Sequence, residues 1–268
     1  MPFTTNKGVR LYWEEQGQGS PVLLIMGHRY SSAMWYPVWD ALAAHHRVIR
    51  FDNRGTGSTD TVRGFEVTDL ADDAVAVLDA AGIAKAHIYG VSMGGVITLD
   101  LALRHPARAT SLILGCTGIL SADKPRLPAF MRALYYLPRP LLAWLFSRRG
   151  HGYGSAAPVD KIAEDRAVLD KDICTMRGVA AQAAAMSRHR VSVGAVRGLT
   201  LPTLVLHGDE DGTVPFAYGT ELAGALPNSQ FVKLEGAGHN YFVAQSDKAN
   251  AAVLDFLAKQ DAAGTKLP

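Results

Sequence analysis

The sequence has few cysteines, no long apolar run and little net charge, and each shortage excludes a class of protein. Cys116 and Cys174 are the only cysteines among 268 residues, at no metal-ligand or redox spacing, so we expect ordinary thiols without a disulfide. No apolar run reaches the ~20 residues of a membrane span, and the first residues lack the apolar core of a signal peptide. A net charge of +2 gives no reason to expect a nucleic-acid partner. We therefore expect a cytoplasmic protein with no membrane span.

Hydrophobic residues make up 48% of the chain, enough for the core of one large α/β domain. Residues 22–25 form a continuous apolar run, which is typical of a strand buried on both faces. Such runs alternate with helical stripes, one of which precedes Gly82, a natural helix C-cap. The alternation predicts a mostly parallel sheet with helices on both faces and functional residues beyond the carboxyl ends of the strands. Other strands are expected at 9–14, 47–51, 111–114, 204–206 and 231–234, and helices at 32–44, 216–225 and 249–259.

Residues 119–197 interrupt this alternation because they contain helical patterns and no clear strand. We interpret them as a helical cap inserted into a core formed by residues 1–118 and 198–268. The segment contains 13 Lys and Arg against 6 Asp and Glu. This excess is either a solvated basic helix face or a surface that attracts an anionic substrate, lipid or partner.

The pentapeptide Gly90-Val91-Ser92-Met93-Gly94 lies between a short apolar run and a helical stretch. A strand, a sharp turn and a helix are the context that a Gly-x-Ser-x-Gly nucleophile elbow requires. The turn strains the serine backbone and exposes its hydroxyl, and only small residues fit on either side of it. We predict that Ser92 is a catalytic nucleophile.

A serine hydroxyl needs a base to take its proton, and that base needs an acid to fix its tautomer. Two later strand-end loops supply candidates in the order acid and then histidine: residues 207–215 contain Asp209, Glu210 and Asp211, and residues 235–239 end in His239. The other histidines form no metal-ligand cluster in the sequence, and His207 is expected to pack or to bond backbone. His239 is the predicted base.

Residues 90–95, 207–215 and 236–239, together with the loop at 51–58, resemble the motifs of the α/β-hydrolase superfamily. The resemblance covers about residues 9–259 and implies the α/β-hydrolase fold. The acid of that pattern lies three residues beyond the Gly of His-Gly, which selects Asp211, with Asp209 as the alternative. Asp52 and Arg54 fall in a loop that braces the elbow region in this superfamily, so we assign them a structural role.

The resemblance also implies an oxyanion hole made of backbone N–H groups. Met93, which follows the nucleophile, supplies one donor, and His28 supplies the other. The loop reads Met26-Gly27-His28 instead of the common His-Gly-x, a variant similar to a subset of small esterases that includes methylesterases acting on polyketide antibiotics. Only an amide is needed, so we expect the hole to form.

Aromatic and aliphatic residues of the cap exceed what burial against the core requires, which favours an apolar substrate pocket beneath it. The candidate substrate contacts are Arg29, Tyr135, Trp144 and Met176. A dimer contact or a membrane-surface helix would use the same apolar residues, so the sequence is also compatible with a homodimer. The side chains of His28 and Arg29 either bind a polar group of the substrate or face solvent and neighbouring loops.

These features predict a serine hydrolase that cleaves a small, largely apolar carboxylic ester or lactone, with no cofactor or metal. Three alternatives keep the same residues: a cofactor-free perhydrolase of the haloperoxidase type, a carbon–carbon bond hydrolase, and a small-molecule receptor with very slow turnover.

Overall fold

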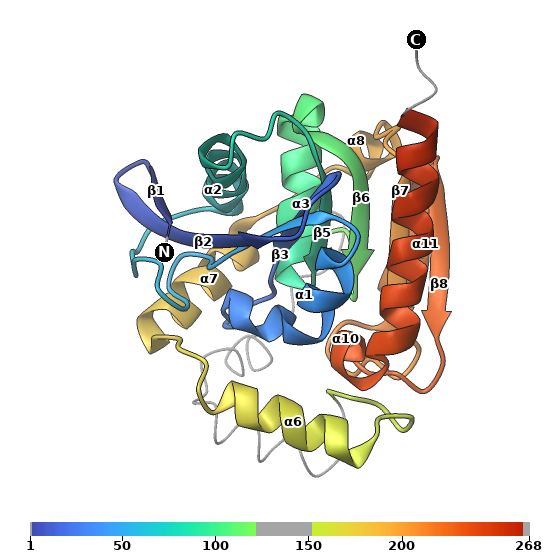
Figure 1. Cartoon of the computed structure of the whole chain (residues 1–268). Coiled ribbons are helices and arrows are strands. Elements are labelled where there is room, and N and C mark those ends of the chain that lie inside the picture. Colours follow the sequence, from blue (N-terminus) through green and yellow to red (C-terminus); the bar gives the residue numbers. More distant parts are fainter. Residues whose placement is uncertain (1, 122–151, 265–268) are drawn as a thin grey trace.

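A sheet of eight strands forms the centre of the computed structural model, which describes residues 2–121 and 152–264 (Figure 1). The strand order is β1-β2-β4-β3-β5-β6-β7-β8, and all neighbours are parallel except the pairs β1 with β2 and β2 with β4. The predicted mostly parallel sheet is therefore confirmed. The strands are β1 (Phe3–Asn6), β2 (Val9–Gln16), β3 (Pro21–Ile25), β4 (Arg47–Phe51), β5 (Ala86–Val91), β6 (Ala109–Gly115), β7 (Thr203–Gly208) and β8 (Ser229–Leu234).

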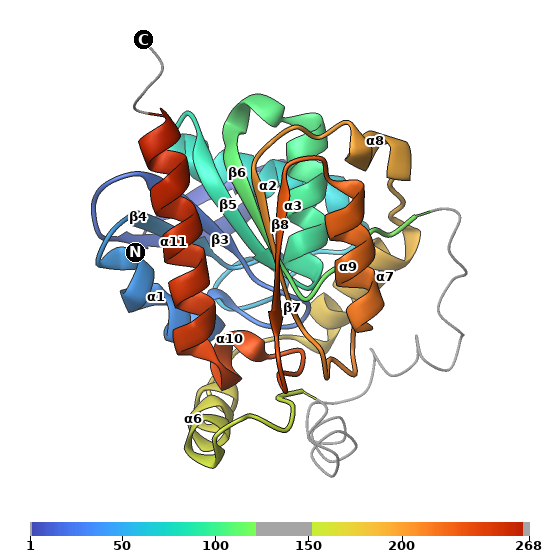
Figure 2. The same ribbon diagram turned by 90° about the vertical axis from the view of Figure 1, so that its right-hand side faces the viewer.

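Helices cover both faces of the sheet, with α1 and α11 on one face and α2, α3 and α9 on the other (Figure 2). Strand β3 shows why both faces must be covered: Val22 and Leu24 pack into the first layer, and Leu23 and Ile25 into the second. All four side chains are fully buried, which explains the continuous apolar run in the sequence. The helices are α1 (Tyr36–Ala43), α2 (Val67–Ala80), α3 (Met93–Arg104), α6 (Val159–Leu169), α7 (Met176–Arg188), α8 (Val193–Arg197), α9 (Phe216–Ala225), α10 (Tyr241–Ala244) and α11 (Ser246–Gly264), with 3-10 turns at η1 (Ser32–Trp35) and η2 (Pro106–Arg108).

Local sequence signals set several helix boundaries. Helix α2 begins with a capping box in which Glu66 and Asp69 each accept a hydrogen bond from the other's backbone N–H, and it is followed by Gly82 at a φ of +68°. The helix predicted over 32–44 is divided into η1 and α1. Pro37 lies in the first turn of α1, where the missing N–H costs no intrahelical hydrogen bond.

Helices α6, α7 and α8 lie in the long connection between β6 and β7, and α6 crosses the molecule beyond the carboxyl ends of β6 and β8 (Figure 1). Polar contacts join α7 to the core: the His28 Nε2 donates to Val179 O at 2.9 Å, and the Gln182 side chain accepts from Arg29 N and donates to Arg54 O. No described helix combines the length and the hydropathy needed to cross a bilayer.

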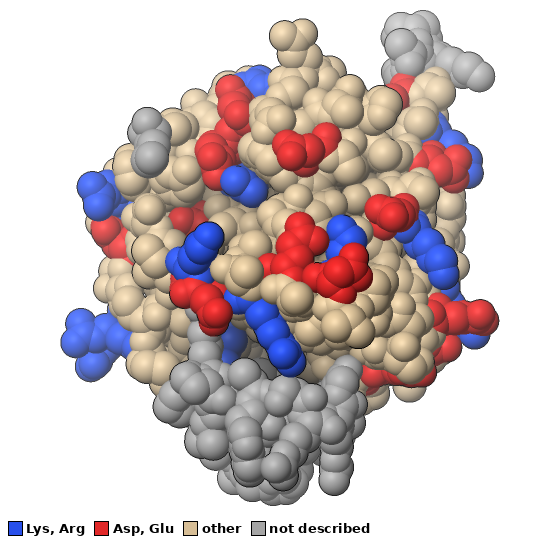
Figure 3. Space-filling view, turned by 60° about the horizontal axis from the view of Figure 1, so that its bottom comes forward, with Lys and Arg blue, Asp and Glu red and all other residues tan. Residues whose placement is uncertain are grey.

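Figure 3 shows acidic and basic side chains interspersed over the described surface on the α6 side of the molecule. In the sequence, most of the basic excess expected for the cap falls within residues 122–151, which lie outside the described residues. The described residues of the connection, 152–197, carry 7 Lys and Arg against 5 Asp and Glu. A strongly basic face is therefore absent from this described part.

Candidate active site

Ser92 lies at the tip of β5, between that strand and α3, in the backbone conformation that the elbow motif predicts. Its φ of 55° and ψ of −120° are costly for a residue with a side chain. A Cβ on Gly90 would collide with Gly94 O, and one on Gly94 would collide with Ile25 O. Glycine is thus required on both sides of Ser92, because strand, helix and the end of β3 meet there.

Asp211 lies in the loop after β7, and four polar groups surround its carboxylate. Its Oδ1 accepts from the N–H groups of Thr213 and Val214 at 2.8 Å each, and its Oδ2 accepts from His239 Nδ1 at 2.8 Å. His207 Nε2 donates to Val214 O at 2.9 Å and lies 3.3 Å from Asp211 Oδ2. The structure therefore brings the predicted acid and base together and orients His239 through its Nδ1 proton.

The surroundings shift the pKa values of both partners. Burial alone would raise the pKa of Asp211, but His239, His207 and the Val214 amide outweigh it and hold the pKa well below its usual range. Burial alone would lower the pKa of His239, whereas Cys116 and Asp211 raise it well above its usual range. Asp211 is therefore ionised at neutral pH, and His239 is a stronger base than free imidazole.

Cys116 is the neighbour of His239 that sequence reasoning missed. It follows β6, is fully buried, and its thiol contacts the His239 ring and the backbone amide of Ser92. Burial raises the pKa of this thiol. No spacing along the chain indicates this contact, because Cys116 and His239 meet only when β6 and the loop after β8 reach the same edge of the sheet.

The loop after β3 passes beside Ser92, as the predicted oxyanion hole requires. A Cβ on Gly27 would lie 3.2 Å from Ser92 Cβ and 3.8 Å from its Oγ. Met93 is the first residue of α3, where backbone N–H groups have no intrahelical acceptor. The His28 side chain bonds Val179 O of α7, and burial lowers its pKa to about 4, so it is a neutral link to a neighbouring element.

The chain just before α6 lies against the loop that carries His239. Gly238 N donates to Tyr153 O at 2.8 Å, Asn240 N donates to Gly152 O at 2.6 Å, and Ala156 N donates to Gly236 O at 2.9 Å. The segment 152–156, named here the clasp, therefore bonds the backbone on both sides of His239.

The two other acids of the acid loop have structural partners. Asp209 Oδ1 accepts from Gly236 N at 2.7 Å, so this alternative acid bonds the backbone of the histidine loop, while His239 pairs with Asp211. Glu210 is exposed and accepts from the Ser155 N–H and hydroxyl at 2.6 and 2.7 Å.

The predicted substrate contacts have different outcomes. Arg29 is buried, with a φ of 69°, and its backbone N–H donates to Gln182. Met176, which was expected to line a pocket, is the first residue of α7 and has 49% of its surface exposed. Tyr135 and Trp144 lie outside the described residues.

Arg54 and Asp52 have the bracing contacts expected of a structural loop. The Arg54 guanidinium donates to both carboxylate oxygens of Asp73 in α2, at 2.6 and 2.8 Å, and both side chains are buried. Asp52 accepts from the Ser32 N–H and hydroxyl and from Ser58 N. These bonds tie the loop after β4 to α2 and to η1.

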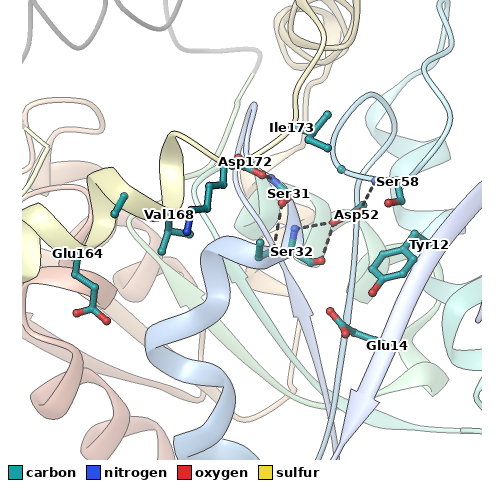
Figure 4. Close-up of a pocket in the computed structure, with 14 residues that line it drawn as sticks. Tyr12, Glu14, Ser31, Ser32, Asp52, Ser58, Glu164, Val168, Asp172 and Ile173 are labelled. Atoms are coloured by element: carbon teal, nitrogen blue, oxygen red, sulfur yellow. Dashed lines mark hydrogen bonds between the residues drawn. The ribbon is translucent and has the colours of Figure 1, made fainter. Parts of the chain in front are cut away.

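A cavity of about 530 Å³ lies where the end of α6 meets the loops after β3 and β4 (Figure 4). Its lining includes Asp52 and Asp172, but not Ser92, Asp211 or His239. Asp52 bonds Ser32 and Ser58, and Asp172 accepts from Ser31 N, so both carboxylates hold loops together. The cavity is thus separate from the groups around Ser92.

Known proteins are similar to this chain in sequence and in architecture. The sequence profile described as "Alpha/beta hydrolase family" matches residues 22–255. A protein of Azorhizobium caulinodans named "Putative carbamate hydrolase RutD" is 30% identical, over 97% of this chain and 100% of that protein. The enol-lactonase of Burkholderia xenovorans LB400 has a TM-score of 0.82 at 25% identity, covering 96% of this chain and 100% of that one. A thermophilic esterase of Thermogutta terrifontis has a TM-score of 0.84 at 27% identity, covering 96% and 97%.

Proposed function

Because the chain belongs to the alpha/beta hydrolase family, we propose that it is a serine hydrolase that cleaves a small carboxylic ester or lactone through an acyl-enzyme. The observation that carries the proposal is the 2.8 Å hydrogen bond between Asp211 and His239, at the same edge of the sheet as the strained turn of Ser92. An ionised acid, an oriented imidazole and a partly exposed serine are the groups that acyl transfer needs.

Each group then has one role in the reaction. The Oγ of Ser92 attacks the carbonyl carbon while His239 takes its proton, and Asp211 stabilises the imidazolium that forms. The N–H groups of Met93 and His28 hold the oxyanion, each contributing about 3–4 kcal/mol to the transition state. His239 returns the proton to the leaving alcohol. Water then attacks the acyl-enzyme and gives its proton to His239, which passes it to Ser92 Oγ as the acid leaves. These steps use only groups of the chain and water.

The names of the relatives support an ester or lactone substrate and add a carbamate as a second candidate. An enol-lactonase and an esterase of the same architecture support the ester or lactone. The named carbamate hydrolase makes a carbamate the second candidate, because attack on a carbamate carbonyl uses the same nucleophile, base and oxyanion donors. We propose that residues 119–197 form a cap over this site and that Tyr135 and Trp144 contribute its apolar lining.

The test is intact-mass labelling with a fluorophosphonate probe, comparing the wild type with Ser92→Ala. We expect one adduct per chain, absent from the variant, and loss of esterase turnover with a thermal midpoint that is unchanged or higher, because the strained turn costs stability. A folded wild type that takes no label, or a variant with near-full activity, would contradict the proposal.

The substrate class follows from a matched panel of p-nitrophenyl esters of increasing length, a lactone and a p-nitrophenyl carbamate. Repeated turnover identifies a hydrolase, and the preferred acyl group sizes the pocket. A release of one equivalent followed by a stall would instead identify a receptor with a slow serine. Hydrogen peroxide added as a competing acyl acceptor detects perhydrolysis.

A further inference from the structure

We propose that Cys116, Asp211 and His239 form a binding site for one divalent metal ion of the Zn²⁺ or Co²⁺ class. A thiol sulfur, a carboxylate oxygen and a ring nitrogen, one from each residue, all lie within 4.8 Å of one another. The bound ion would also inhibit the protein, because it would occupy the base that activates Ser92. This consequence rests on the proposed function. The binding itself does not depend on any catalytic activity.

The chemical elements of the three donor atoms and the distances between them both suit such an ion. Zinc and cobalt accept sulfur, nitrogen and oxygen together, whereas magnesium and calcium prefer oxygen alone. Bonds of about 2.0–2.3 Å in a tetrahedral site place neighbouring donors about 3.5 Å apart. The three side chains therefore need to move by no more than about 1 Å to close around an ion. Three protein ligands also leave a fourth position, open to water.

The backbone holds these donors in place before any ion arrives. Cys116 has a φ of 39°, and its N–H donates to Leu206 O at 2.9 Å, which fixes the residue between β6 and β7. Ser92 N donates to Gly115 O at 2.8 Å and keeps β5 against the same corner. Asp211 is anchored by two amides on Oδ1, which leaves Oδ2 directed at His239.

The three ligand side chains are largely buried, so an ion that has lost its hydration water would be held tightly by them. The side chains of Asp211 and His239 are 0% and 13% exposed, and Cys116 is fully buried. Binding releases the thiol proton of Cys116 to solvent. The ion takes His239 Nδ1 in place of the hydrogen bond to Asp211, and the Nδ1 proton moves to Nε2. The partly exposed His239 ring gives the ion its route to the thiol. An imidazole bound to metal cannot take the proton of Ser92, so occupancy stops acyl transfer.

The experiment titrates chelator-treated full-length protein with Co²⁺ and records its absorption spectrum. Cys116→Ala is compared with Cys174→Ala, a matched control because Cys174 is the chain's other cysteine and belongs to no such cluster among the described residues. We expect the wild type and the control to bind one Co²⁺ per chain with a thiolate-to-metal absorption band. Cys116→Ala should lose that band, and its Zn²⁺ affinity should fall at least about tenfold.

Two further variants keep the proposal falsifiable. Cys116→Ser preserves the size of the side chain if the alanine variant does not fold, and His239→Gln removes the nitrogen ligand; both should lose the band. A band that persists in Cys116→Ala, a band that disappears in Cys174→Ala, or a wild type without saturable binding would overturn the site. Fluorophosphonate labelling of the metal-free wild type separately tests the reactivity of Ser92, so failure of the proposed function and failure of the metal site can be told apart.

Discussion

His239 is the residue on which the chemistry of this site depends most. Its Nδ1 is paired with Asp211 at 2.8 Å, and the neighbouring groups raise its pKa although burial opposes them. A general base works only when it is unprotonated, so a raised pKa moves the onset of activity to higher pH. The same shift makes the imidazole a stronger base once the proton has left.

We therefore expect kcat/KM for an activated ester to rise with pH and to level off only above the ordinary imidazole pKa of about 6.5. The profile is measured from about pH 5 to about pH 9.5 in buffers of constant ionic strength. Asp211→Asn removes the charge that favours the imidazolium, so the midpoint should move down while the rate falls by about 10⁴-fold. A wild-type midpoint at or below the ordinary value would contradict the raised pKa of His239.

The sequence predicted some residues of this site and missed others. Ser92, Asp211 and His239 were predicted because each belongs to a local motif at the end of a strand. Cys116 was read as an ordinary buried thiol, since its closeness to His239 arises from strand order and not from spacing along the chain. Met176 was assigned to a pocket from its residue type alone, and the structure exposes it. Residue type predicts chemistry, but only tertiary packing decides which groups meet.

Among the elements, the clasp at residues 152–156 bonds directly to the loop that carries His239, the proposed base. It bonds Gly236, Gly238 and Asn240 by backbone alone, so no side-chain pattern in the sequence could have revealed it. Within it, Tyr153 donates to Asp165 of α6 at 2.6 Å. Movement of α6 is thereby linked to the loop that carries His239.

Gly154→Ala should lower kcat by about 10²-fold, because small displacements of a catalytic group are costly. Gly154 has a φ of +83°, and a Cβ there would collide with Gly236 O and Gly238 N, so the histidine loop must shift. The measurement is steady-state kinetics on one ester, together with the thermal midpoint. Gly224→Ala is the control, because a Cβ at Gly224 in α9 meets nothing within 4 Å. Equal kcat in both variants would show that the clasp does not position His239.

At the scale of the whole molecule, stability depends on ties between segments that are distant in the chain. Asp73 in α2 accepts from Arg54 after β4 and from Asn6 in β1, the latter at 2.7 Å. All these groups lie on the side of the sheet where the first strands are antiparallel. Loss of one member would leave a buried charge without its partner.

Asp73→Asn should lower the free energy of unfolding by about 3–5 kcal/mol, as expected for a broken buried ion pair. Urea denaturation measures the change, with Asp79→Asn as the control, because Asp79 is 64% exposed and its pairing with Arg108 should contribute no more than about 1 kcal/mol. Below its unfolding transition, Asp73→Asn should still take the fluorophosphonate label. A folded variant that cannot be labelled would instead indicate that the Arg54 loop acts in catalysis.

The overall architecture was predicted far better than the connection between β6 and β7. Buried parallel strands such as β3 have continuous apolar runs, and α2 has an apolar stripe and a capping box, so local physics determined their type and place. The helices of the connection pack through contacts such as Gln182 with Arg29 and Arg54. Those contacts depend on loops more than a hundred residues away, and no periodic pattern encodes them.

The order of the strands has a consequence for the synthesis of the protein. Strand β5, with Ser92 at its tip, leaves the ribosome early, whereas β7 and β8 are the last two strands made and carry Asp211 and His239 at their ends. A nascent chain that has not yet reached Thr203 displays the serine without its base or acid. On the mechanism proposed above, the growing polypeptide is inert toward esters until its last quarter, from Thr203 onward, has been translated and has docked beside β6.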